Sequence, residues 1–285
     1  MFISERREPL FSFPGLPESV AAGPASDFVL RPFGLYESDL NVDFEQAVRP
    51  FLVTEILECC TRDAGGGRVN PDFFWGLTVG KRIECLLHLL WSANGPEIGA
   101  TFLCPNEGCG QELEIEISLA EIGALQAEAY AADPVLVPFE KASWALRRPT
   151  GSDQLAWLKN RIAAPEAAIQ TMVRTLRLPF PNDGANDEDA IPNALVPMVE
   201  QALEEFDPLV NFSLQVNCFS CGAENQIELD LEEFSLRRLR QAQLRLLASV
   251  HKLAAHYHWS EQQIFSVPYW RRARYLSLIE KEKNQ

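Results

Sequence analysis

The chain has 285 residues, of which 47% are hydrophobic and 23% are charged, and its formal net charge at pH 7 is −15. This composition is typical of a globular protein rather than a disordered one, and the length allows one large domain or two small ones. The acidic balance argues against broad electrostatic capture of nucleic acid or anionic membrane, because both need a basic protein surface.

The first 18 residues predict neither a secretory signal nor a transit peptide, because they mix charges of both signs with prolines and lack a continuous apolar stretch. Apolar runs elsewhere, such as CLLHLLW, fall far short of the roughly 20 residues that cross a bilayer. We therefore expect a soluble protein made in a cytosol. The chain has seven cysteines, and in a cytosolic protein clustered cysteines favour metal binding over a disulfide framework.

The N-terminal third predicts an arm followed by helices. Residues 1–40 contain repeated proline and glycine turns, which are typical of an extended arm with little regular structure. Within residues 41–97, the apolar spacing predicts one helix from about Phe44 to Leu57, which ends before the flexible AGGGR. A second helix is predicted over residues 79–92, with Ile83, Leu87 and Leu90 on one face, and the strand GATFL follows it.

Two segments far apart in the chain share one pattern. CGQELEIEISLAEI, which begins at Cys109, aligns without a gap with CGAENQIELDLEEF, which begins at Cys221. The alignment indicates an internal duplication of one hairpin arm, over residues 98–123 and 209–235. In each copy acidic and apolar residues alternate, which predicts a strand with one buried face. The glycine after the cysteine supplies a backbone position that tolerates a positive φ.

Each copy also carries an earlier cysteine, so two pairs of thiolates are available. Four thiolates make a closed tetrahedral zinc site with no coordination position left for water or substrate, and such a zinc ion is structural. The predicted ligands of one zinc ion per chain are Cys104, Cys109, Cys218 and Cys221. A single CxxC pair also suits thiol redox chemistry. That alternative is weaker here because thioredoxin-like pairs open a helix, whereas both pairs lead into a predicted strand.

The remaining reactive side chains have simpler interpretations. Cys59, Cys60 and Cys85 stand in apolar helical sequence and are predicted to be small buried hydrophobes.

The sequence contains no GxxxxGK[ST], GxGxxG, HExxH or GxSxG motif. We therefore expect a protein that is not an enzyme.

An inserted segment, residues 124–208, separates the two arms. Two short strands are predicted within residues 135–151, followed by a helix from Ser152 or Asp153 through Ile162 and another over residues 165–176. Residues 178–194 are acidic and contain prolines, which predicts an exposed loop. A helix over residues 195–206 then leads to the strand of residues 209–217.

The C-terminal segment, residues 236–285, is predicted to be helical. A long helix runs from about Leu231 to His258, a short turn begins at Ser260, and a last helix runs from Pro268, a suitable first residue, to about Lys283. The expected fold is α+β and mainly helical. It combines a split four-cysteine zinc ribbon with an inserted α/β segment and a C-terminal helical hairpin.

Arginines cluster on the two predicted C-terminal helices, although the chain as a whole is acidic. They are Arg237, Arg238, Arg240 and Arg245 on the long helix, and Arg271, Arg272 and Arg274 on the last. Together with a zinc ribbon, they permit a nucleic-acid-binding or regulatory adaptor protein. We favour the simpler interpretation, in which these arginines pair with the chain's own carboxylates or with an acidic partner.

Four segments carry a family signature. FDPLVNFSLQVNCFSCG has an aspartate–proline step, Asp207–Pro208, before the second cysteine pair, and HYHWSEQQI is followed by RRARYL. WALRRPTGSDQLAWL adds an arginine, a proline and an aspartate at a strand-to-helix boundary, and GLTVGKRIECLLHLL precedes the first cysteine pair. From about Leu77 onward the chain therefore resembles the baseplate hub assembly chaperone family of contractile-tailed phages and related contractile injection systems. It departs in the first cysteine pair, where four residues intervene and the family usually has two.

The resemblance implies a non-enzymatic assembly factor or structural component of the baseplate hub, made in the bacterial cytoplasm, where tails assemble. Its partners would be hub or spike proteins, and neither membrane, nucleic acid nor a small-molecule substrate is expected. Because aromatic residues and arginine are enriched at interface hot spots, the C-terminal helical hairpin is the predicted contact surface. The predicted partner-binding residues are Trp259, Tyr269, Trp270, Arg271, Arg272 and Tyr275.

Overall fold

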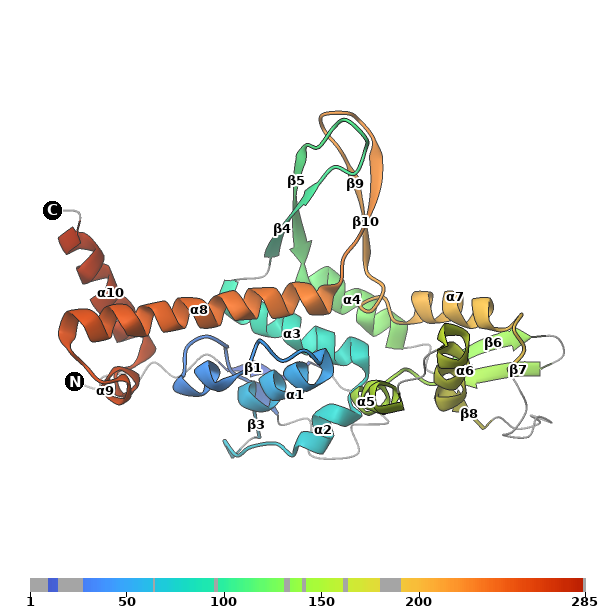
Figure 1. Ribbon diagram of the computed structural model, residues 1–285, viewed down its shortest axis with the longest axis horizontal. Coiled ribbons are helices and arrows are strands. Elements are labelled where there is room, and N and C mark those ends of the chain that lie inside the picture. Colours follow the sequence, from blue (N-terminus) through green and yellow to red (C-terminus); the bar gives the residue numbers. More distant parts are fainter. Residues whose placement is uncertain are drawn as a thin grey trace.

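The computed structural model describes residues 10–14, 28–63, 65–94, 97–130, 134–139, 142–160, 164–179 and 191–283. They form an α+β structure of helices and small antiparallel sheets, as the sequence predicts. Helix α8 (Leu231–Tyr257) is a long rod along which the other parts are arranged, and two β-hairpins project together from the body (Figure 1). No helix in these ranges is both long and apolar enough to cross a membrane.

The main core is built around α3 (Val79–Asn94), against which α1 (Arg49–Cys60) and α8 pack, while the short helix α2 (Pro71–Gly76) packs on α1. The helix predicted near residues 79–92 is thus confirmed, and the helix predicted over residues 44–57 is present but begins later, at Arg49. Leu86, Leu87 and Leu89 of α3 are each at most 1% exposed. A helix that buries more than one apolar face lies inside the protein rather than on its surface, so α3 is a central element rather than a one-sided one.

The described part of the predicted N-terminal arm belongs to this core. Strands β1 (Phe11–Ser12), β2 (Val29–Leu30) and β3 (Thr61–Arg62) form a small antiparallel sheet, and a 3-10 helix, η2 (Glu37–Asn41), follows β2. Leu30 and Phe33 are buried. The prediction of an extended arm is therefore wrong for residues 28–40, because their apolar side chains fill the main core. Residues 1–9 and 15–27 of that prediction lie outside the described residues.

A buried ion pair fixes this N-terminal segment. The Arg31 guanidinium lies 2.6 Å from the Asp39 carboxylate, and both side chains are almost fully buried. The other carboxylate oxygen of Asp39 accepts hydrogen bonds from three consecutive backbone N–H groups, those of residues 34–36. Gln243 of α8 donates to the backbone carbonyls of Asp39 and Val42. Buried charges are tolerated when they are paired and hydrogen-bonded in this way, so the segment is tied to α8.

The two projecting hairpins are β4 (Glu97–Leu103) with β5 (Glu112–Ser118), and β9 (Ser213–Asn217) with β10 (Glu224–Glu228). In β5 and β10, exposed acidic or polar residues alternate with more buried ones, as predicted. Helix α4 (Leu119–Tyr130) follows β5, and α8 follows β10. Their first residues, Leu119 and Leu231, are equivalent in the sequence alignment. The duplication therefore includes a hairpin and the start of the helix that follows it.

The inserted segment has a small core of its own. Strands β6 (Val135–Phe139), β7 (Ala142–Leu146) and β8 (Arg177–Leu178) form its sheet. Its helices are α5 (Gly151–Asn160), α6 (Pro165–Leu176) and α7 (Val196–Phe206). The predicted strands and helices are confirmed, and β8 was not predicted. Residues 180–190, which make up most of the predicted acidic loop, lie outside the described residues.

A polar joint connects the inserted segment to the main core. Asp207, which ends α7, is 3% exposed and faces Gly80 at the start of α3. Burial raises the pKa of Asp207 to about 6, against the opposing effects of the Arg148 charge and the Gly80 N–H. Arg148 in turn donates to the carbonyls of Ala129 and Phe206. The joint therefore connects α3, α4, α7 and the turn after β7.

The C-terminal segment folds back on the end of α8. His258 adopts the left-handed conformation (φ 57°) and ends α8, and Ser260 then caps a further helix, α9 (Glu261–Ser266), where only a turn was predicted. Helix α10 (Tyr269–Lys283) follows and packs across the last part of α8 (Figure 1). The rings of Trp259 and Tyr257 stack with centroids 4.9 Å apart, and Tyr275 meets both edge-on. These aromatic contacts hold the predicted hairpin closed.

Substitutions at two glycines in helices test the packing at the polar joint. A Cβ added at Gly80 would meet the Asp207 carboxylate and lie 3.0 Å from Gln126 Nε2, whereas one added at Gly123 in α4 would meet nothing within 4 Å. We expect Gly80→Ala to destabilise the protein by about 2 kcal/mol through overpacking. Gly123→Ala should stabilise it by about 0.5–1 kcal/mol, because alanine suits a helix better. Thermal denaturation midpoints of the two variants should shift in opposite directions, and equal shifts would contradict the proposed packing at Gly80.

Candidate metal centre

The four predicted ligand cysteines come together at the tips of the two hairpins. The Sγ atoms of Cys104 and Cys221 are 3.8 Å apart, and those of Cys109 and Cys218 are also 3.8 Å apart. All four sulfur atoms lie within 4.8 Å of one another. A disulfide bond needs about 2.05 Å, so these are four separate thiols. The cluster could hold a metal ion, and it draws its ligands from both halves of the duplication.

Glycines shape the two turns that present the sulfur atoms. Gly110 and Gly222 directly follow the second cysteine of each pair, and their φ angles are 58° and 70°. A residue with a Cβ is strained in this left-handed region, whereas glycine is not. The prediction that these positions need a positive φ is confirmed for both copies.

A small apolar cluster lies directly beneath the sulfur atoms. Leu113 of β5 is buried there with Cys104 and Cys218, and Val216 and Ile227 of the other hairpin pack against it. The two hairpins form separate two-stranded sheets. Because an isolated two-stranded hairpin is only marginally stable, the apolar cluster and the cysteine centre together account for the packing of one hairpin on the other.

Hydrogen-bond donors near the sulfur atoms favour thiolates. The side-chain amide of Asn106 donates to Cys221 Sγ over 3.5 Å, and together with the Ala223 N–H it lowers the pKa of that thiol to about 6. The Asn106 N–H also lowers the pKa of Cys104, but burial and the neighbouring thiols outweigh it and raise that pKa to about 11. At neutral pH Cys221 is thus mainly a thiolate, which is the form of cysteine that binds a metal ion.

Asn225 supports the second turn from the buried face of β10. Its side-chain amide donates to the Ala223 carbonyl over 3.0 Å and lies 3.8 Å from Cys104 Sγ. This residue was not predicted from the sequence. The signal was present, because Asn225 aligns with Leu113 of the first copy and is a polar residue at a position that the alternation assigns to the buried face.

The three cysteines outside the centre differ in burial. Cys60 and Cys85 are fully buried, as predicted, but Cys59 is only partly buried. A hydrogen bond with Cys60 and the charge of Arg31 lower the pKa of the Cys59 thiol to about 7. Asp39, Cys59 and Cys60 also lie close enough to hold a cation. However, Arg31 donates hydrogen bonds to both Asp39 and Cys59, and its positive charge opposes a metal ion at that point.

The predicted partner-binding residues differ in exposure. Arg271 is exposed, and Tyr269 and Trp270 are partly exposed on the same helix, α10. Arg272 is buried, and its guanidinium donates to the Leu35 carbonyl. Arg272 therefore holds the C-terminal hairpin against the N-terminal segment, and it is not available at the surface. The other predicted residues, Trp259 and Tyr275, belong mainly to the aromatic cluster that closes the hairpin.

Several arginines of α8 pair with the chain's own carboxylates, as the simpler interpretation expected. Arg237 lies 3.5 Å from Glu233, and Arg240 pairs with Glu45. These pairs are solvent-exposed and contribute little to stability. They do reduce the positive charge that α8 presents to solvent, which weakens the argument for a nucleic-acid surface on that helix.

Comparisons of the chain with protein-family models, with curated proteins and with solved structures found no match. The residues of the chain and their geometry are therefore the basis for inferring its function.

We expect Asn225→Leu to weaken metal binding about tenfold while the fold is retained, because outer-shell hydrogen bonds commonly contribute 10–100-fold to metal affinity. Leucine is the residue at the equivalent position of the first copy, so the hairpin can accommodate it. The measurement is competition with a chromogenic chelator. Gln226→Leu, on the exposed face of the same strand, is the matched control and should bind as the wild type does. Equal affinity of both variants would exclude a supporting role for Asn225.

Proposed function

We propose that the chain is a non-enzymatic assembly factor or structural component of the baseplate hub of a contractile phage tail or injection system, held together by a structural zinc ion. The observation that carries the proposal is the role of the family-signature residues in the fold. Asp207 forms the buried joint, Cys218 and Cys221 provide half of the cysteine centre, and Trp259 closes the C-terminal hairpin. These are structural tasks, as expected of a scaffold rather than a catalyst.

Zinc is the metal that this donor set suits best. Zinc–sulfur bonds are about 2.3 Å long, and the edge of a tetrahedron is about 1.63 times that length, which gives a sulfur separation of about 3.8 Å. The two sulfur pairs are 3.8 Å apart. Tetrahedral four-sulfur sites select zinc or iron. Four protein ligands leave no open position, so a zinc ion here would hold the two hairpins together without doing chemistry.

The contact surface that we propose for hub proteins is the outer face of the C-terminal hairpin. Trp270 and Arg271 lie there, and the guanidinium of Arg274 is 5.4 Å from the Trp270 ring centroid. Large aromatic side chains and arginine are the residues most often found at interface hot spots. Because Arg272 is buried, it supports this surface from within.

The alternative function is a zinc-ribbon nucleic-acid-binding or regulatory adaptor protein. Residues 97–118 and 213–228, which contain both hairpins, include seven glutamates and no lysine, arginine or histidine. Nucleic-acid binding needs positive charge near the phosphates and weakens steeply with salt. Strong, salt-sensitive binding to generic DNA would support the adaptor function, and its absence would favour the assembly factor.

The metal content of the purified protein tests the zinc site. We expect one zinc ion per chain in protein prepared without added metal, and none in the Cys218→Ser, Cys221→Ser variant, because two thiolates cannot complete the site. The double variant should also lose the packing of the two hairpins, measured as faster amide hydrogen exchange in residues 97–118 and 213–228. Cys85→Ser, at a buried cysteine outside the centre, is the control and should retain its zinc. Zinc that persists in the double variant would contradict the site.

Binding to hub and spike proteins tests the function. Purified wild-type chain should form a complex with at least one hub or spike protein of the system that encodes it, and deletion of its gene should leave tails without assembled hubs. Trp270→Ala with Arg271→Glu should weaken the complex at least tenfold without loss of zinc. Arg237→Glu, an exposed arginine on α8, is the matched control. A system that assembles normally without the chain would rule out the proposed function.

A further inference from the structure

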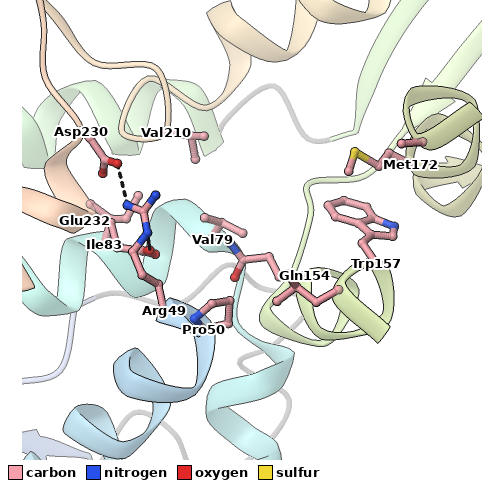
Figure 2. Close-up of a pocket in the computed structure, with 12 residues that line it drawn as sticks. Arg49, Pro50, Val79, Ile83, Gln154, Trp157, Met172, Val210, Asp230 and Glu232 are labelled. Atoms are coloured by element: carbon pink, nitrogen blue, oxygen red, sulfur yellow. Dashed lines mark hydrogen bonds and ion pairs between the residues drawn. The ribbon is translucent and has the colours of Figure 1, made fainter. Parts of the chain in front are cut away.

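A groove lies between the main core and the inserted segment. A cavity of about 600 Å³ lies between the start of α1, the start of α3, the β10–α8 boundary and helices α5 and α6. We call it the apolar cleft. Figure 2 shows Trp157 and Met172 on one side of it and Arg49, Asp230 and Glu232 at its other end. A volume of this size is typical of sites that receive a ligand.

The walls of the apolar cleft are mostly hydrophobic and open to solvent. Its apolar lining residues are Pro50, Val79, Ile83, Trp157, Leu158, Ala168, Met172 and Val210. Leu158 of α5 is 49% exposed and Met172 of α6 is 36% exposed, so neither helix packs fully against the main core on this side. Clustered exposed apolar side chains mark interaction sites more often than single ones. Methionine adapts its shape easily and is common on surfaces that bind peptides.

A second hollow continues the cleft and is acidic. It has a volume of about 690 Å³, and it shares Val210 and Asp230 with the apolar cleft. Its lining includes Glu204 and Glu205 of α7 and Glu228 of β10. We call it the acidic hollow. Among the residues that line either hollow, Arg49 is the only cation, and it already lies 2.6 Å from Asp230. The combined groove is thus apolar at one end and negatively charged at the other.

We propose that this groove binds a linear segment of a partner protein, in which a large apolar side chain is followed by lysine or arginine. The apolar side chain occupies the cleft between Ile83 and Trp157, and the basic residues lie over the acidic hollow near Glu205. The site is separate from the C-terminal hairpin and does not depend on the baseplate function. It would give the protein a second contact surface, independent of that hairpin.

The chemistry of the groove favours a peptide over other ligands. Nucleic acid and anionic lipid are disfavoured by the carboxylates of the acidic hollow. A small apolar molecule would fill the cleft but would leave the acidic hollow unused. A peptide segment matches the separation of apolar from acidic surface, as in other grooves that recognise short segments by anchor side chains.

Panning a random 16-residue peptide library against the zinc-loaded full chain tests this inference without knowledge of the natural partner. Enriched peptides should share a large apolar residue near lysine or arginine. Ala168→Phe fills the cleft, because Ala168 lines it, whereas Ala167→Phe places the same ring in solvent one residue away. We expect Ala168→Phe to weaken binding of an enriched, labelled peptide at least tenfold, and Ala167→Phe to change it less than twofold, by fluorescence anisotropy.

Charge-reversal variants test the acidic hollow independently of the apolar cleft. Glu205→Lys, in the acidic hollow, should weaken the same peptide at least threefold, and Glu200→Lys, exposed on α7 outside it, should not. Enrichment of no peptide, or of peptides that bind the Ala168→Phe variant as well as the wild type, would overturn the inference. Tight binding of a neutral apolar probe such as Nile red that peptides do not displace would assign the cleft to small molecules instead. None of these outcomes bears on hub binding through the C-terminal hairpin.

Discussion

The meeting of four sulfur atoms is the constraint on which the rest of the structure depends. It joins positions 117 and 109 residues apart in sequence. The entropy cost of closing such long loops must be offset by the contacts that form. Beneath the sulfur atoms there are only a few apolar side chains, among them Leu113, Val216 and Ile227. The metal ion that we propose would add to this stabilisation, because metal-binding free energy adds directly to folding when the site exists only in the folded state.

Helices α4 and α8 connect the two hairpins to the body of the protein. Strand β5 leads into α4 and β10 leads into α8, at equivalent residues of the duplication. Both helices pack on α3. The inserted segment begins after α4 and returns at Asp207, so its two ends are held by the same frame. The relative position of the hairpins therefore also fixes where the inserted segment meets the main core, and with it the width of the groove between them.

Local patterns allowed the hairpins, the cysteine centre and most helices to be predicted, because ligand spacing, alternation and apolar periodicity are properties of short segments. The features that were missed depend on contacts between distant segments. Residues 28–40 were expected to form an arm, yet Arg31 and Asp39 pair and Leu30 fills the core. Helix α9 depends on the cap at Ser260. The groove combines residues from six separate stretches of chain between Arg49 and Glu232, and no single stretch has its pattern.

Helix α8 sets the distance between the groove and the C-terminal hairpin, the two proposed contact surfaces. Asp230, which caps its first turn, lines both halves of the groove, and Tyr257, its last residue, lies in the aromatic cluster of the C-terminal hairpin. With 27 residues, the helix is about 40 Å long at 1.5 Å per residue. Its buried side chains run through both the main core and the C-terminal cluster, so it cannot bend without disturbing them. Two contact surfaces of different chemistry, held at a fixed separation by one rigid helix, would let the protein orient one partner relative to another.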